Sequence, residues 1–171
     1  MFKYIRSSEK LVSIVDRISY VGAKRASVRI GVGKLMQQEL RRIVESFLVS
    51  NTGGLATTKV TKKSGEPVFN AGDKGHFMDL LETGKVDIRH EGRTLEAVEA
   101  GGIVGEMSLV DDDARRSADA IVRQDATLIP INQQKFRELV QRNPDFALAV
   151  MTVLARRLRE MNERITASQG G

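Results

Sequence analysis

The stretch GEMSLVDDDARRSADA, residues 105–120, holds side chains that could bind an anion next to a hydroxyl group. Gly105 would let backbone N–H groups approach an anion closely, and a helical turn beginning at Glu106 would point its first amides the same way. Arg116 supplies a planar fork of donors that matches phosphate oxygens, and Ser117 adds a hydroxyl beside it. An ionised Glu106 only accepts hydrogen bonds, so it suits a sugar hydroxyl and not the phosphate. The stretch therefore predicts a site for a phosphate and a neighbouring hydroxyl.

Short strands are predicted before this stretch. Residues 85–89, KVDIR, place Val86 and Ile88 on one face, and residues 94–99, TLEAVE, form another short segment of strand character. The tripeptide EGR between them is typical of a hairpin tip. Glycines separate these segments at the spacing of short strands joined by tight turns, at positions Gly65, Gly72, Gly75, Gly84, Gly92, Gly101 and Gly102. This spacing indicates a small barrel or jelly roll.

Two more strands and two helices are predicted after it. The segments ADAIVRQ and ATLIPIN predict strands with Asp125 at their turn, and Pro130 places the second strand at an edge or a bulge. A short helix follows and ends before Pro144, because the residue preceding a proline is disfavoured in helical conformation. A long helix with one apolar side then begins, carrying Phe146, Val150, Val153, Leu154, Arg157, Leu158, Met161 and Ile165. Residues 166–171 are predicted to be a flexible tail.

The positive charge of the chain lies in its first part. Residues 1–54 hold ten Lys or Arg against four Asp or Glu, whereas the whole chain has a formal net charge of +5. Apolar spacing predicts two short amphipathic helices in this segment, and a Ser, Asn, Thr and Gly cluster places a boundary near Gly54. The segment could contact nucleic acid or an acidic surface. The alternative is a solvated basic extension without a partner, because no aromatic residues are interleaved with the charge.

Several classes of site are excluded by composition. The chain has no cysteine and only two histidines, His76 and His90, so disulfides, thiolate nucleophiles and the usual zinc sites are not expected. Asp111, Asp112 and Asp113 are consecutive and point in different directions, which favours a solvated loop tip over a metal site. No segment has the length and hydrophobicity of a membrane helix or the pattern of a secretory signal, so a cytoplasmic location is expected.

Four separate motifs resemble the cyclic-nucleotide-binding domain shared by bacterial catabolite activators, protein kinase A regulatory subunits and cyclic-nucleotide-gated channels. GEPVFNAGD (65–73) is similar to the family's early strand and turn, and ETGKVDI (82–88) to its central strand. The stretch GEMSL…RSA resembles the phosphate-binding cassette, and NPDFALAVMTVLARRLREMN (143–162) the closing helix. The resemblance implies a domain over residues 55–165. Its fold class is mainly β with flanking helices: a jelly-roll barrel followed by a long C-terminal helix and preceded by short N-terminal helices.

The resemblance also implies roles for individual residues. Glu106 would hold the ribose 2′-hydroxyl and Arg116 the cyclic phosphate, with the rest of the cassette around them. Where catabolite activators place a Thr-Ser pair against the base, this chain has Met161 and Asn162. The implied ligand-binding set is Gly105, Glu106, Met107, Ser108, Arg116, Ser117, Ala118, Met161 and Asn162. Two structural alternatives without ligand binding stay open: Arg116 and Glu106 could form an ion pair, and Met161 could be a core residue.

The function expected from these observations is a regulatory module that binds cAMP or cGMP and signals through its C-terminal helix. No nucleophile is paired with a histidine base, so neither catalytic residues nor a cofactor or metal ion are expected. The apolar stripe of the long helix could cover the chain's own barrel or pair with its copy in a homodimer. Direct binding to operator DNA is not expected. Two alternatives remain: a scaffold without ligand that binds an effector protein, and a nucleic-acid-binding protein acting through residues 1–54.

Overall fold

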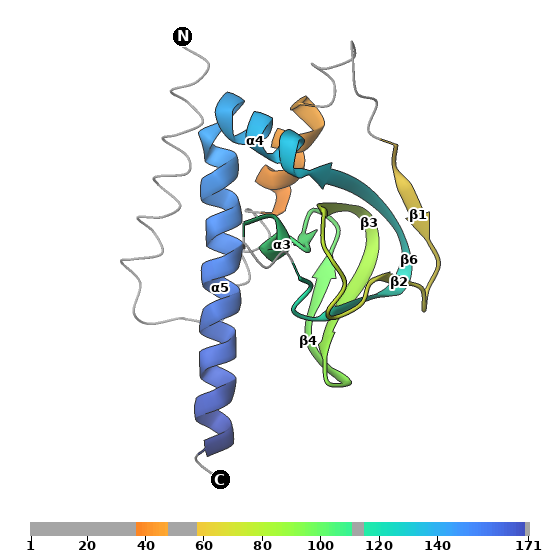
Figure 1. The fold of residues 1–171 in the computed structure, drawn as a ribbon, viewed down its shortest axis with the longest axis vertical. Coiled ribbons are helices and arrows are strands. Elements are labelled where there is room, and N and C mark those ends of the chain that lie inside the picture. The colour runs from red at the N-terminus through yellow and green to blue at the C-terminus, as the bar shows by residue number, and fades with distance from the viewer. Residues whose placement is uncertain (1–36, 48–57, 111–114, 170–171) are drawn as a thin grey trace.

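The computed structural model of the chain describes residues 37–47, 58–110 and 115–169. Two long antiparallel strands, β3 and β6, form the centre of a rolled six-stranded sheet, and helices pack along one side of it (Figure 1). The strands are β1 (Val60–Lys62), β2 (Pro67–Phe69), β3 (Phe77–His90), β4 (Arg93–Glu99), β5 (Ile103–Val104) and β6 (Asp119–Asn132). The helices with labels are α3 (Met107–Val110), α4 (Gln133–Arg142) and α5 (Pro144–Gln169).

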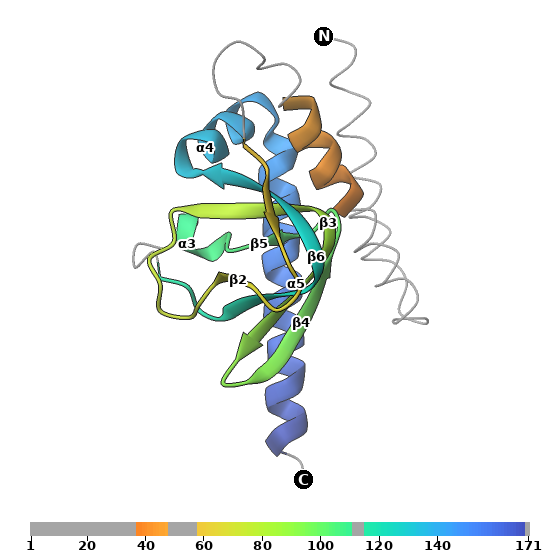
Figure 2. The ribbon, with the colours of Figure 1, turned by 90° about the vertical axis from the view of Figure 1, so that its right-hand side faces the viewer.

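The pairing of the strands builds one sheet around two long central strands. β3 and β6 pair along their whole length, β1 and β2 add to β6, and β4 and β5 add to β3. The register between β3 and β6 shifts at three places between Leu81 and Val86, and such irregularities bend a sheet. The view turned by 90° shows the strands curling around a common interior with α5 behind them (Figure 2). The predicted mainly-β jelly roll with a long C-terminal helix is therefore confirmed.

The prediction of two strands with a turn at Asp125 was wrong, because β6 runs without interruption from Asp119 to Asn132. The acidic residue is tolerated inside the strand because its carboxylate accepts a hydrogen bond from the Ser64 amide at 2.9 Å and pairs with Lys63 at 2.8 Å. Gly84 of β3 lies against this point with φ +89°, and a Cβ there would lie 2.3 Å from the Asp125 carbonyl oxygen. The close crossing of two bent strands replaces the expected turn.

The hairpin predicted at EGR is present between β3 and β4. Glu91 and Gly92 have φ values of +49° and +75°, the left-handed backbone that a tight two-residue turn requires. Pro130 faces Asp79 of β3 across the sheet, while β1 pairs with β6 only at residues 126–128. The proline therefore lies where β6 is paired with β3 alone, as an edge position requires.

Two hydrophobic clusters hold the fold together. The first lies between the sheet and the helices and joins Met78 and Leu80 of β3 to Leu139 of α4 and Phe146 of α5. The second fills the interior of the barrel with Leu81, Val86, Val98, Val104, Ala120, Val122, Ala126 and Leu128. Met78 is fully buried in the first cluster. Burial of apolar side chains at roughly 25 cal/mol per Å² makes both clusters the main source of stability.

The helical residues 37–47, orange in Figure 1, add to the first cluster. Leu40, Ile43, Val44 and Phe47 are buried in it, at the helical spacing that the sequence predicts. This part of the basic segment is therefore packed on the barrel and is not a separate extension. The other predicted N-terminal helix and the boundary near Gly54 lie outside the described residues.

The long helix α5 uses two different faces. Phe146, Val150 and Val153 are buried against the chain's own core, so this half of the predicted stripe covers the barrel. Met161 is 52% exposed, which shows that its interpretation as a core residue was wrong. The helix continues to Gln169, past the start of the tail predicted at residue 166.

Candidate functional site

The cassette begins at the end of β5 with a conformation that needs glycine. Gly105 has φ +78°, and a Cβ on it would lie 2.0 Å from Nη1 of Arg116. On the loop before β3, a Cβ on Gly75 would lie 2.2 Å from Oγ of Ser108 and 2.8 Å from Cζ of Arg116. Both contacts are closer than a side chain tolerates, so the two glycines let the backbone close around the guanidinium. Helix α3 follows Gly105 and Glu106 as the short turn that the sequence predicts.

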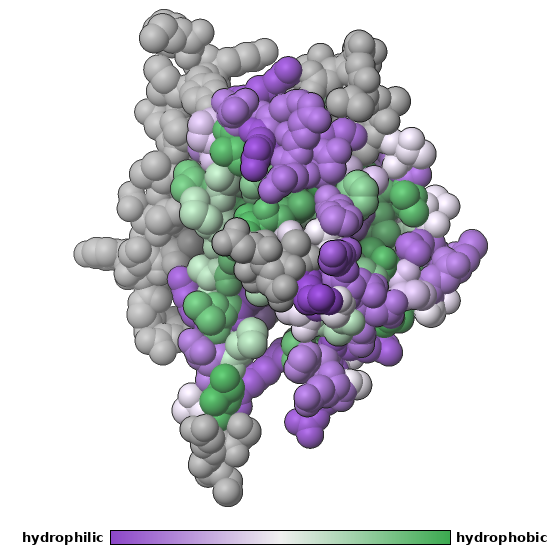
Figure 3. Space-filling model, in the orientation of Figure 1, coloured by the Kyte–Doolittle hydropathy of each residue, from purple (hydrophilic) through white to green (hydrophobic). Residues whose placement is uncertain are grey.

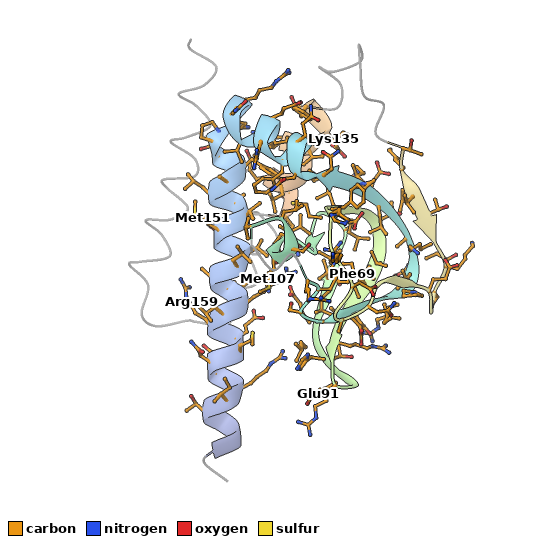
Figure 4. The ribbon with its side chains drawn as sticks, in the orientation of Figure 1. Phe69, Glu91, Met107, Lys135, Met151 and Arg159 are labelled. Atoms are coloured by element: carbon orange, nitrogen blue, oxygen red, sulfur yellow. The ribbon has the colours of Figure 1, made fainter. Side chains whose placement is uncertain are left out.

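Arg116 is buried and fixed by the cassette itself. Its Nη1 donates to the Gly105 carbonyl and to Oγ of Ser108, both at 2.8 Å, and its Nη2 donates to the Phe77 carbonyl at 2.7 Å. Its Cζ lies 4.0 Å from the centre of the Phe69 ring, in cation–π contact. Figure 4 shows Phe69 inside the curve of the barrel. Burial lowers the pKa of Arg116, and the charges of Asp79, Glu106 and Asp73 oppose that effect.

One donor of the guanidinium, the Nε–H, remains without a partner among the described residues. Arginine has five N–H donors, and three of those on Arg116 are used by the bonds above. The Nε–H is buried without a hydrogen-bond partner in these residues, and one Nη2–H is also left over. Nε and Nη2 lie on the same edge of the planar group. That edge is the fork with which arginine binds carboxylate or phosphate.

Glu106 is 1% exposed and belongs to the same site. One carboxylate oxygen, Oε1, pairs with Arg157 of α5, whereas Oε2 is buried without a partner among the residues that the structure describes. Glu106 therefore pairs with Arg157 and not with Arg116, so the alternative of a structural ion pair between Glu106 and Arg116 was wrong. A buried carboxylate oxygen of this kind accepts readily from a hydroxyl.

Arg157 connects the cassette, strand β4 and helix α5. Besides Glu106, its guanidinium binds Glu96 of β4 at 2.7 Å and the Ile103 carbonyl at 2.8 Å. Arg156 binds the other oxygen of Glu96 at 2.6 Å. Burial acts to lower the pKa of Arg157, but Glu106 and Glu96 more than offset it, so the pKa lies above its usual value. Sequence reasoning assigned Arg157 no role at the site; an arginine inside a buried apolar stripe was the signal, because a buried charge needs a partner.

The other predicted residues fall into two groups. Ser108 is buried, donates to the Gly105 carbonyl at 2.9 Å and accepts from Arg116. Ala118 is buried as well. Ser117 is exposed and donates to the sulfur of Met107 at 3.6 Å. The structure thus brings the cassette residues together. It does not join Met161 and Asn162 to them, since both are exposed on α5 beyond Arg157.

The arrangement is suited to binding. Counting only described residues as partners, it offers one unpaired buried donor, Nε–H of Arg116, and one unpaired buried acceptor, Oε2 of Glu106. Within the described ranges, no three His, Cys, Asp or Glu side chains are grouped as metal ligands. In the same ranges, no helix is long and apolar enough to cross a membrane.

The sequence model of the family "Cyclic nucleotide-binding domain" matches residues 59–143, from β1 to the end of α4. The chain carries a cyclic nucleotide-binding domain of the catabolite-activator type. A solved structure of the catabolite activator protein of Thermus thermophilus has the same fold, with a TM-score of 0.61 and 31% identity over 75% of this chain and 59% of that one.

Two relatives show how far the similarity extends. The cyclic AMP receptor protein of Thermus thermophilus is 39% identical over 101 residues, which are 56% of this chain and 46% of the relative. A Pycsar effector protein of Xanthomonas perforans is 29% identical over 133 residues, which are 74% of this chain and 44% of the relative. The chain therefore spans slightly under half the length of these relatives. The cyclic nucleotide-binding domain is the part in common.

Proposed function

We propose that this domain binds cAMP or cGMP, with Arg116 at the cyclic phosphate and Glu106 at the ribose 2′-hydroxyl. The observation that carries the proposal is the pair of buried groups without partners, Nε–H of Arg116 and Oε2 of Glu106. A buried polar group left unpaired costs about 1–3 kcal/mol. A ligand with an anionic acceptor next to a hydroxyl donor would satisfy both. The similarity to a protein named for cyclic AMP favours cAMP as the first ligand to test.

The proposed output is a change in the position of α5. Glu106 is shared between the ligand site and Arg157, so a nucleotide that binds Glu106 alters the contact that holds α5 to the cassette. A ligand shifts such an equilibrium only by its different affinity for the two states. The module is proposed to be regulatory and not an enzyme, because the site offers donors and an acceptor but no paired nucleophile and base.

Calorimetric titration with cAMP and with cGMP tests the proposal. Arg116→Ala is expected to weaken binding about ten- to a hundredfold, since hydrogen bonds to charged groups contribute roughly 1.5–3 kcal/mol. Arg116→Lys is expected to recover only part of the affinity, because a lysine cannot present two donors in one plane. Arg115→Ala is the matched control: this neighbour is exposed and donates to the Gly72 carbonyl on the outside of the site.

Two results would contradict the assignment. If Arg116→Ala and Arg115→Ala titrated like the parent protein, Arg116 would not be the phosphate partner. If neither nucleotide released or absorbed heat over a wide concentration range, the scaffold alternative would replace the binding function.

A further inference from the structure

Asp79 is a buried carboxyl group inside the barrel that the proposed contacts with nucleotide do not use. Its neighbours in β3, Met78 and Leu80, belong to the cluster under the helices. Side chains alternate along a strand, so Asp79 faces the other way, into the barrel. Its partner across the sheet, Val104, belongs to the cluster that fills the barrel. Asp79 is only 9% exposed.

The position of Asp79 places a negative charge close to the phosphate fork. Phe77, two residues earlier in β3, supplies the carbonyl that fixes Arg116, and Val104 directly precedes Gly105. Asp79 is the carboxylate that acts most strongly on Arg116, ahead of Glu106 and Asp73. An ionised Asp79 thus acts on the same cation that the phosphate would need.

The charged groups around Asp79 are few. Arg116 at the cassette and Lys62 of β1 favour its ionised form, whereas Glu106 and Asp73 act on Arg116. β5 and α3, which complete the wall of the site, contain no ionisable side chain. Burial outweighs the two cations and raises the pKa of Asp79 to about 6. The carboxyl therefore changes its charge near neutral pH.

We propose that Asp79 makes anion binding in the barrel proton-dependent: its carboxylate competes with the bound phosphate for Arg116, and it takes up one proton when a cyclic nucleotide binds. The inference rests on the proposed function. The phosphodiester brings a negative charge to a site where the buried carboxylate of Asp79 already acts electrostatically on Arg116. A proton from solvent, bound at a carboxylate oxygen of Asp79, removes the repulsion and leaves Arg116 to the ligand.

This coupling sets the direction of the pH effect. A group that gains a proton on binding makes binding tighter at lower pH, by up to about tenfold per pH unit between its free and bound pKa values. If the pKa of Asp79 rises by one to two units in the complex, affinity should fall roughly five- to twentyfold between about pH 6 and pH 8.

The test is calorimetric titration of the full chain with cAMP and cGMP at several pH values, in buffers with different heats of ionisation. The parent protein is expected to take up a fraction of a proton to one proton per nucleotide near neutral pH and to bind less tightly as the pH rises. Asp79→Asn keeps the shape of the side chain without its charge. It is expected to take up no proton, to bind with nearly constant affinity, and to exceed the parent protein in affinity at about pH 8.

Asp87→Asn is the matched control. Asp87 is also a buried aspartate of β3, but its side chain pairs with Arg89 at 3.1 Å and Arg123 at 3.7 Å, away from the cassette. This variant should keep the pH profile and the proton uptake of the parent protein. Circular dichroism and thermal unfolding identify any variant that does not fold, in which case Asp79→Ser provides the uncharged side chain.

The outcomes separate the two proposals. If the parent protein binds neither nucleotide, both proposals fail. If it binds but Asp79→Asn keeps the same pH profile and proton uptake, the role of Asp79 fails and the nucleotide site stands. If folded Asp79→Asn loses affinity at every pH, Asp79 is a direct acceptor for the ligand, and the proposed competition is overturned.

Discussion

Gly105 combines a left-handed backbone with a contact that leaves no space for a side chain. Gly105→Ala would place a methyl group against Nη1 of Arg116 and 3.1 Å from the Phe69 ring, so the guanidinium must move. We expect this variant to lose roughly 1–3 kcal/mol of stability and to bind cyclic nucleotide at least tenfold more weakly. Chemical denaturation and calorimetric titration measure the two effects.

Gly65→Ala separates the backbone effect from the contact. Gly65 has φ +90°, but nothing lies within 4 Å of a Cβ built on it. We expect a loss of about 1 kcal/mol of stability with unchanged affinity. Equal losses of affinity in both variants would show that the closeness of Gly105 to Arg116 has no part in binding.

Asp79 also affects stability, in a direction set by its pKa. The pKa is raised from the ordinary 3.8 to about 6 by burial, so its contribution to stability is present below pH 3.8 and is lost as the pH rises through 6. The difference between these values corresponds to about 3 kcal/mol at most. Without ligand, Asp79→Asn should therefore gain free energy of unfolding relative to the parent protein as the pH rises from about 4 to 7.

Denaturant titrations at both pH values measure this difference. Asp87→Asn, which loses its pairing with Arg89, is expected to be less stable than the parent protein at about pH 7. A constant difference between Asp79→Asn and the parent protein at all pH values would show that folding does not raise the pKa of Asp79.

The cassette could be predicted from sequence because its signals are local. Gly105, Glu106 and Arg116 occur within one stretch, and each residue type has a distinct hydrogen-bonding role. The roles of Asp79 and Arg157 depend on tertiary packing. Asp79 lies at the site because β3 pairs with β5 there. Arg157 lies at the site because α5 packs where its guanidinium binds Glu96 and Glu106. Residue spacing shows Arg157 inside an apolar stripe but does not identify its partners, and it gives no signal for Asp79.

At the scale of single elements, the strands β3 and β6 show where periodicity is insufficient. Alternation identified strand character around Val86 and Ile88, and the hairpin at Glu91 and Gly92 was specified by its turn residues. The continuity of β6 through Asp125 was not predicted, since a charged residue between two apolar runs is typical of a turn. The partners of Asp125 come from the loop between β1 and β2, which lies far away in sequence.

The attachment of α5 to the barrel gives a prediction at the same scale. Glu96 of β4 binds Arg156 and Arg157 together and is 13% exposed in its side chain. Burial would raise the pKa of Glu96, but Arg157 and Arg156 more than offset it and hold the pKa below its usual value. The carboxylate therefore stabilises the attachment above its ordinary pKa, and this contribution is lost as the pH falls through the lowered value.

Glu96→Gln is expected to loosen α5 without unfolding the barrel. Replacing a largely buried carboxylate that binds two guanidinium groups should cost about 1–3 kcal/mol, or a roughly five- to hundredfold faster amide exchange in the second half of α5. Glu160→Gln is the control, because Glu160 is 38% exposed and its ion pair among the described residues is with Arg156 alone, at 3.1 Å. Equal exchange rates in the two variants would contradict the anchoring role of Glu96.

At the scale of the whole molecule, α5 presents a second apolar face that its own barrel does not cover. Leu148, Met151, Leu158, Met161 and Ile165 are each at least half exposed. Figure 3 shows hydrophobic side chains at intervals along the lower part of this helix, and Figure 4 shows Met151 projecting from the side opposite the barrel. The homodimer proposed for this chain would therefore use this face, and not the residues Phe146, Val150 and Val153, which are buried in the core.

Residues on and next to this exposed face have a spacing that fits the pairing of two helices. Leu148, Met151, Ala155, Leu158, Asn162 and Ile165 follow each other at alternating intervals of three and four residues, the pattern of a coiled-coil seam. Leu158, 60% exposed, would be central in that seam.

Leu158→Glu places a charge there and is expected to convert a dimer to a monomer in sedimentation equilibrium. Leu158→Met preserves the apolar volume and should keep the dimer. Leu158 does not contact the barrel core, so each variant should unfold at about the same temperature as the parent protein in the same oligomeric state. A parent protein that is monomeric at all concentrations would show that this face does not pair with its copy.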